Sequence, residues 1–111
     1  MPGKKFKLLA EEIIQLITSM GGCLATDKIT VDGFKVGFMY RKDPFDEIDS
    51  GWRFFSGHED QDYIDTPDNS MIYDVNTIAN YDKAIIPYLN LFIGTELERL
   101  ENTNEFQIVP G

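Results

Sequence analysis

The sequence lacks the residues on which several protein classes depend. It has one cysteine in 111 residues, Cys23, so no disulfide can form within the chain, which fits a reducing cytosol. It has one histidine, His58, and one residue of each kind is a poor supply for a transition-metal site. Its apolar runs are a handful of residues long, far short of the roughly 20 that a membrane-spanning helix needs. We therefore expect no disulfide scaffold, transition-metal centre or membrane span.

The amino-terminal lysines are not followed by the apolar core of a signal peptide. Lys4, Lys5 and Lys7 are typical of the basic start of such a peptide, but Glu11 and Glu12 interrupt the stretch that should follow. We therefore expect the protein to stay in the cytoplasm.

Basic residues are almost absent from the middle of the chain. The net charge is −9, and between Asp43 and Asp82 eleven acidic residues stand against one basic residue, Arg53. Such a field repels nucleic acid and anionic membranes, and it attracts a basic protein partner. A solvated surface that confers solubility is the other interpretation of the same charge.

The length of the chain and its 42% hydrophobic content predict a single domain, residues 1–111, with one core. Five apolar residues near the amino terminus recur at the spacing of one helix face, namely Leu9, Ile13, Leu16, Ile17 and Met20. This pattern predicts an amphipathic helix over residues 8–20, ended by two glycines.

From Cys23 to Arg41 the pattern changes to the alternation of strands. Asp32-Gly33 lies between two apolar runs and predicts a β-hairpin in which Val31 faces Phe34. Continued backward, this register would bury the carboxylate of Asp27, so we expect a break near Asp27-Lys28.

The rest of the chain reads as short strands and helical turns between acidic loops. Residues 43–50 and 57–70 are predicted loops, and residues 51–56 are predicted to form a central strand because both faces carry bulky side chains. Asp74 or Asn76 is expected to cap a helical turn that runs through Ala79, and Asp82 to cap another.

Three further extended segments complete the predicted sheet. Residues 71–73 are a short extended piece, and residues 95–100 and 105–109 form a closing hairpin. The predicted fold is α+β: an antiparallel sheet of about five strands, with an N-terminal helix and short helical turns packed against it.

No set of residues demands a particular chemistry. His58 has no nucleophile motif near it, Cys23 is typical of a small core residue, and no glycine pattern of a phosphate-binding loop is present. We expect no enzyme activity and no cofactor. Oxygen ligands for calcium gather in one loop, although their spacing misses the EF-hand pattern, so a calcium or small-ligand binding module stays open: Asp60, Asp62, Asp65, Asp68 and Asn69.

Aromatic residues interleaved with acids favour a protein-binding surface. Trp52 and Tyr73 are better explained as core residues, whereas Tyr63 lies in a predicted loop and is the better exposed anchor. The candidate partner-binding residues are Asp46, Glu47, Asp49, Glu59, Asp60, Asp62, Tyr63 and Asp65.

Four blocks of the sequence resemble the immunity-protein-33-like family, and the GWRFF core of the third block is fairly specific. They are CLATDKITVDG at 23–33, KVGFMYR at 35–41, DSGWRFFSG at 49–57 and IYDVNTIANYD at 72–82. The resemblance implies an α+β bacterial protein, and some members of the family are thought to be immunity partners of toxins. With the charge pattern it implies a basic toxin as the partner. It implies no catalytic residues. Residues 1–21, which contain the predicted N-terminal helix, lie outside the region of resemblance.

Overall fold

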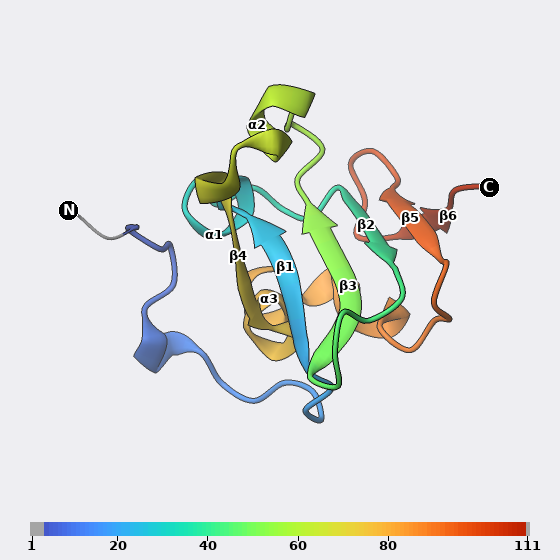
Figure 1. The fold of residues 1–111 in the computed structure, drawn as a ribbon, viewed down its shortest axis with the longest axis horizontal. Coiled ribbons are helices and arrows are strands. Elements are labelled where there is room, and N and C mark those ends of the chain that lie inside the picture. The colour runs from blue at the N-terminus through green and yellow to red at the C-terminus, as the bar shows by residue number, and fades with distance from the viewer. Residues whose placement is uncertain (1–3, 111) are drawn as a thin grey trace.

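The computed structural model describes residues 4–110, and its centre is a mixed sheet (Figure 1). Within the described residues the sheet has six strands in the order β4-β1-β3-β2-β5-β6. β1 and β3 run parallel, and every other neighbouring pair is antiparallel. The strands are β1 (Gly22–Thr26), β2 (Phe38–Arg41), β3 (Asp49–Phe55), β4 (Ser70–Asp74), β5 (Glu96–Arg99) and β6 (Phe106–Ile108).

Short helices connect these strands. The α-helices are α1 (Asp27–Thr30), α2 (Gln61–Asp65) and α3 (Val75–Tyr81), and the 3-10 helices are η1 (Ala10–Glu12), η2 (Pro67–Asn69) and η3 (Lys83–Tyr88). The α+β fold class is confirmed, although the sheet is mixed and has one strand more than predicted. No helix among residues 4–110 is long and apolar enough to cross a membrane.

The predicted hairpin around Asp32-Gly33 is wrong. Residues 27–30 form α1, and the backbone N–H of Gly33 donates to the carbonyl of Ile29 over 3.2 Å, so the glycine ends a helix. Its φ of +83° is the left-handed conformation that helix ends and hairpin turns both require, which is why one sequence signal serves either structure. The break expected near Asp27-Lys28 is confirmed, because β1 ends at Thr26.

The predicted helix over residues 8–20 is also wrong, because only η1 forms there. Side chains of α3 replace the hydrogen bonds that a helix would make: the Asn76 Oδ1 accepts from the N–H of Leu16 over 2.8 Å, and the Asn80 Nδ2 donates to the carbonyl of Ile14 over 2.8 Å. The isoleucines of this segment are β-branched, which also disfavours a helix. Leu16 still packs against the core, so the apolar spacing marked buried residues correctly.

The strands predicted beyond residue 50 are found, but the loop predicted at 57–70 contains α2 and η2, and the loop predicted at 43–50 ends where β3 begins at Asp49. The strand predicted at 51–56 is β3, and it lies between β1 and β2 near the centre of the sheet. β4 contains the extended piece at 71–73, and β5 and β6 form the closing hairpin. The Asp82 carboxylate caps η3 by accepting from the N–H of Ala84 over 3.1 Å, whereas Asp74 precedes α3 without a capping bond from its side chain.

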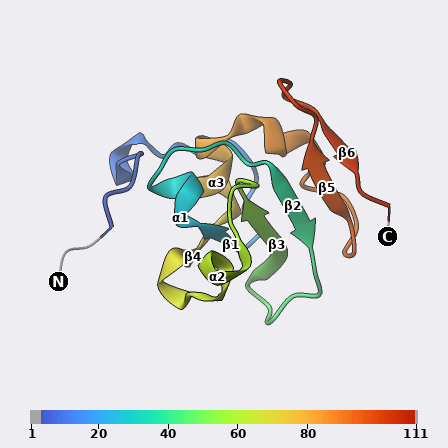
Figure 2. The same cartoon turned by 90° about the horizontal axis from the view of Figure 1, so that it is seen from above.

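One face of the sheet forms the core. α1, α3 and η3 cover this face (Figure 2) and pack on Trp52 and Phe54 of β3, both fully buried. The Trp52 Nε1 donates to the carbonyl of Leu89 over 3.0 Å, so the buried indole leaves no polar atom without a partner. Trp52 is thus a core residue, and Tyr73 is partly buried against the same cluster.

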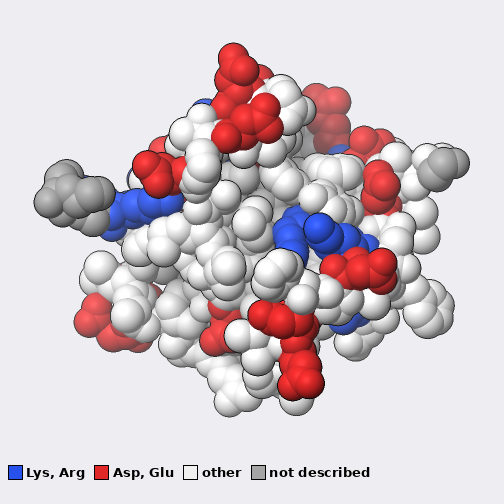
Figure 3. Space-filling view, viewed as in Figure 1, with Lys and Arg blue, Asp and Glu red and all other residues white. Residues whose placement is uncertain are grey.

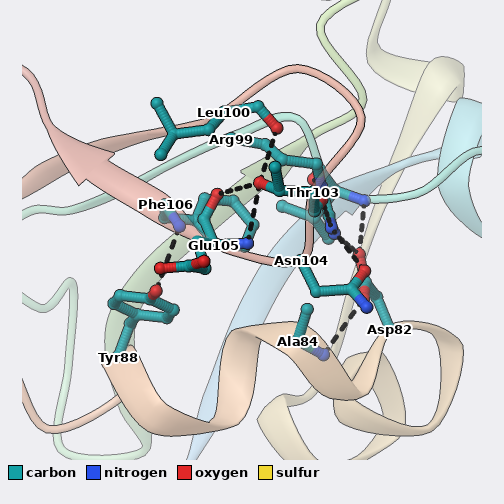
Figure 4. A network of polar contacts seen from close by, with 10 residues as sticks. Asp82, Ala84, Tyr88, Arg99, Leu100, Thr103, Asn104, Glu105 and Phe106 are labelled. Atoms are coloured by element: carbon teal, nitrogen blue, oxygen red, sulfur yellow. Dashed lines mark hydrogen bonds and ion pairs between the residues drawn. The ribbon is translucent and has the colours of Figure 1, made fainter.

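A buried ion pair fastens the β5–β6 hairpin to the core (Figure 4). Asp82 pairs with Arg99, and its Oδ2 also accepts from the N–H of Val36 over 2.9 Å. The Arg99 Nε donates to the carbonyl of Val36 over 2.8 Å, and its guanidinium lies 4.8 Å from the ring centre of Phe106. One carboxylate therefore ties together η3, the segment before β2, and the hairpin.

We predict that Asp82→Ala lowers the free energy of unfolding by about 3–5 kcal/mol, because it leaves the Arg99 guanidinium without its partner in a largely buried position. Chemical denaturation measures the effect. Glu101→Ala removes an exposed carboxylate from the turn of the same hairpin and should change stability by less than about 0.5 kcal/mol. Equal losses for the two variants would contradict this account of the ion pair.

Candidate functional site

The second face of the sheet faces the viewer in Figure 1, and no layer of helices formed by residues 4–110 covers most of it. We call it the open face. Successive side chains of a strand point to opposite faces of the sheet. The pairing of neighbouring strands therefore shows which residues form one row across the open face. Adjacent strands place these residues next to one another, in the order Ile72, Leu24, Arg53, Tyr40 and Glu96.

Three aromatic rings pack together on the open face. Tyr40 and Phe55 stack with their ring centres 5.8 Å apart and their planes 12° apart. Phe38 lies 6.0 Å from Tyr40 and 6.2 Å from Phe55. All three are half-buried, so they present a rigid apolar surface to solvent.

Beside these rings the open face has a hollow of about 210 Å³. Strands β1, β2 and β3 supply half of its lining residues, and α2 contributes Tyr63 and Ile64. The hollow is lined by Leu24, Thr26, Tyr40, Lys42, Arg53, Phe55, Tyr63, Ile64, Asn69 and Ser70.

Glu59 anchors the segment that leads into α2. Its carboxylate accepts from the Thr26 hydroxyl over 2.5 Å, from the N–H of Ser56 over 2.8 Å and from the N–H of Gly57 over 2.9 Å. Partial burial alone would raise the pKa of Glu59, but these hydrogen bonds together outweigh it and lower the pKa below its ordinary value. Glu59 thus links the carboxyl ends of the parallel strands β1 and β3 to the start of α2.

Two more contacts hold α2 over the hollow. The Asp60 carboxylate accepts from the N–H of Tyr63 over 2.8 Å, which caps the helix. The Lys28 ammonium lies 5.1 Å from the ring centre of Tyr63. Partial burial raises the pKa of the Tyr63 phenol above its ordinary value.

Arg53 is fixed in the wall of the hollow by Asp49. Two guanidinium nitrogens donate to the two carboxylate oxygens over 3.0 and 2.9 Å. The hydrogen bonds from Arg53 hold the pKa of Asp49 well below its usual range. Gly51 lies between the pair with a φ of +91°, and a Cβ there would stand 2.2 Å from the carbonyl oxygen of Lys42, so no larger residue fits.

The predicted binding acids fall into three groups. Asp46 and Glu47 are exposed in the β2–β3 loop, and Asp60, Asp62 and Asp65 are exposed at α2. These two groups lie at opposite ends of β3 (Figure 1). Asp49 and Glu59 form the third group, since both carboxylates are engaged within the chain. Tyr63 is half-buried and lines the hollow.

Figure 3 shows the resulting charge distribution on the open face. Acidic side chains lie over α2 and toward the opposite end, and basic side chains gather near the middle. The sequence interpretation missed Tyr40, Lys42, Arg53 and Phe55 as site residues. The alternation in β3 placed Arg53 and Phe55 on the side away from Trp52, and that was the available signal for a second functional face.

The other candidate chemistries gain no geometric support. No group of three or more His, Cys, Asp or Glu side chains within residues 4–110 could hold a metal ion, which leaves the calcium alternative without a ligand set of that kind. Cys23 is buried, and burial strongly raises the pKa of its thiol, so it is no thiolate nucleophile. His58 is exposed and packs against Phe34, with ring centres 4.7 Å apart and ring planes tilted by 38°.

The lowered pKa of Asp49 predicts an acid-sensitive contribution to stability. A carboxyl whose pKa is depressed by folding stabilises the protein above its unfolded pKa of about 3.9, and this stability is lost as the pH falls toward the folded value. Asp49→Asn should therefore lower the free energy of unfolding at pH 7 and flatten its decline below about pH 5. Urea denaturation at a series of pH values measures both effects. An unchanged slope below pH 5 would contradict the assignment.

Comparison with known proteins identifies the family. The family model described as Immunity protein Imm33 domain matches residues 23–109, which include every strand except the first residue of β1. No curated protein and no solved structure matches the chain. The match agrees with the resemblance of the four sequence blocks, and like that resemblance it leaves out the amino-terminal segment. The chain belongs to the Imm33 immunity protein domain family.

Proposed function

We propose that this protein is a cytoplasmic immunity protein that binds and neutralises a basic toxin protein through the open face of its sheet. The observation that carries the proposal is the half-buried aromatic cluster of this face, with acidic side chains at both of its ends, in a chain of the Imm33 family. An inhibitor of this kind needs complementarity to its target and no reactive group, which fits a site without a catalytic arrangement. We therefore assign it no enzyme activity.

The exposed acids attract the partner from a distance in this proposal. Asp46, Glu47, Asp62 and Asp65 are exposed and face a basic partner as it approaches, and Asp60 both caps α2 and adds to the same field. With a net charge of −9, long-range attraction raises the rate of association more than it raises the final affinity.

The internally engaged acids shape the surface. Asp49 orients Arg53, and Glu59 anchors the approach to α2, which carries Tyr63 above the hollow. Their contribution to toxin binding is therefore indirect. Tyr63 is the aromatic contact residue at the acidic end of the open face, because Tyr side chains are common anchors of protein interfaces.

We predict that the triple variant Glu47→Lys, Asp62→Lys, Asp65→Lys slows association with the toxin about tenfold or more and flattens its dependence on salt. The partner to test is a toxin domain encoded beside this reading frame, and stopped-flow mixing measures the rate. Asp60 is left in place because its carboxylate caps α2. The fold should stay intact because the replaced side chains are exposed.

The matched control reverses the charge of Glu11, Glu101 and Glu105, which are exposed on the amino-terminal segment and at the β5–β6 turn. It changes the net charge by the same amount and should retain most of the association rate. If both triple variants associate at the same rate, steering by the acids of the open face is wrong. If the adjacent toxin does not bind the wild-type chain and is not neutralised by it, the proposed function is wrong.

A further inference from the structure

We propose that the hollow on the open face receives an acidic side chain of the protein partner, with its carboxylate at Lys42 and its aliphatic stem on the rings of Tyr40 and Phe55. This inference rests on the proposed function and deepens it, because it names the chemistry of the partner at the centre of the interface. The binding surface would then recognise charges of both signs. The acidic side chains at its ends would meet basic residues of the partner, and Lys42 would meet an acidic one.

The charge of the hollow is opposite to that of the chain. Its lining contains two basic side chains, Lys42 and Arg53, and no acidic one, whereas the chain has 19 acidic residues against 10 basic ones. The Arg53 charge is balanced by Asp49 in a bidentate pair. Lys42 is exposed, and the ion pairs among residues 4–110 do not include it. Among the basic residues of the lining, Lys42 is therefore the one whose charge no ion pair of the described residues balances.

The backbone of Lys42 is held in place by hydrogen bonds. Its backbone N–H donates to the carbonyl of Gly51 over 3.0 Å, and its carbonyl packs against the same glycine. The preceding residue, Arg41, donates from its Nε to the carbonyl of Ser50 over 2.9 Å, and its backbone N–H donates to the carbonyl of Thr95 over 2.9 Å. Lys42 thus lines the hollow from a fixed backbone, so the freedom lost on binding is that of its own side chain.

The rest of the lining suits the stem of a side chain. The stacked rings of Tyr40 and Phe55 form an apolar wall, and Leu24 and Ile64 add aliphatic surface. Ser70 adds a further polar residue to the lining. Apolar contact along the stem with a charged head at a lysine is a favourable arrangement for Glu or Asp.

The volume of the hollow favours a single side chain over a free metabolite. At about 210 Å³ it is smaller than the roughly 300–1,000 Å³ of sites that enclose small molecules. A polyanion is disfavoured by the exposed acids at both ends of the face. An acidic residue that stands among basic residues on a protein surface satisfies both conditions, and it would fix the orientation of the partner.

A titration with short peptides tests the hollow without the toxin. The probe is the blocked pentapeptide acetyl-Lys-Leu-Glu-Leu-Lys-amide, and the control peptide has Gln in place of Glu. Added at millimolar concentration to the isotope-labelled full chain, the Glu peptide should shift the backbone amide signals of Tyr40, Lys42, Arg53 and Phe55. The Gln peptide should bind about tenfold more weakly, and Lys42→Ala should abolish the difference between the two peptides. Equal binding of both peptides, or shifts confined to other segments, would overturn the proposal.

The adjacent toxin provides the second test. Lys42→Ala should raise the dissociation rate of the complex about tenfold or more, while Lys83→Ala, which removes an exposed lysine from η3, should leave it unchanged. Equal dissociation rates for a toxin that binds the wild type would overturn the inference and leave the proposed function intact. A toxin that does not bind the wild type would overturn the proposed function, and the peptide titration would still decide what the hollow receives.

Discussion

The parallel pairing of β1 with β3 at the centre of the sheet constrains the rest of the structure. Parallel neighbours require a crossover, and here it passes through α1 and β2 before the chain returns as β3. α1 covers the same face as α3 and η3, so the apolar side chains of the central strands are buried on one side only. The opposite face is left to solvent, and the carboxyl ends of β1 and β3 meet where Glu59 joins them to α2. The hollow is a consequence of that topology.

The acidic residues divide into those that build the protein and those that face solvent. Asp82 is buried in an ion pair, and Asp49 and Glu59 accept several hydrogen bonds each, so these carboxylates belong to the folded framework. The exposed acids of α2 and the β2–β3 loop make few contacts and are free to act at a distance. This division explains how a chain with a net charge of −9 keeps a compact core and still projects a negative field. It also separates effects on stability from effects on association.

The fold class and several strands could be predicted from local patterns, because alternation and turn residues act over a few positions. The two errors arose where distant contacts decide the outcome: Asp32-Gly33 suits a helix end as well as a hairpin, and Asn76 captures backbone groups some 60 positions away in sequence. The candidate acids were found from the distribution of charge along the sequence. That distribution does not show which acids are engaged in hydrogen bonds within the fold. The hollow was missed because Lys42 and Tyr40 come together with α2 only through the strand order.

The proposed immunity function depends on the open face as the surface that contacts a toxin. Hydrogen exchange of the full chain, measured free and in complex with the toxin domain encoded beside it, tests this most directly. Exchange in the complex should slow in residues 38–42, 52–56 and 61–65, and it should stay unchanged in α3 and η3. Slowed exchange in α3 and η3, with residues 38–42 and 52–56 unaffected, would contradict the account.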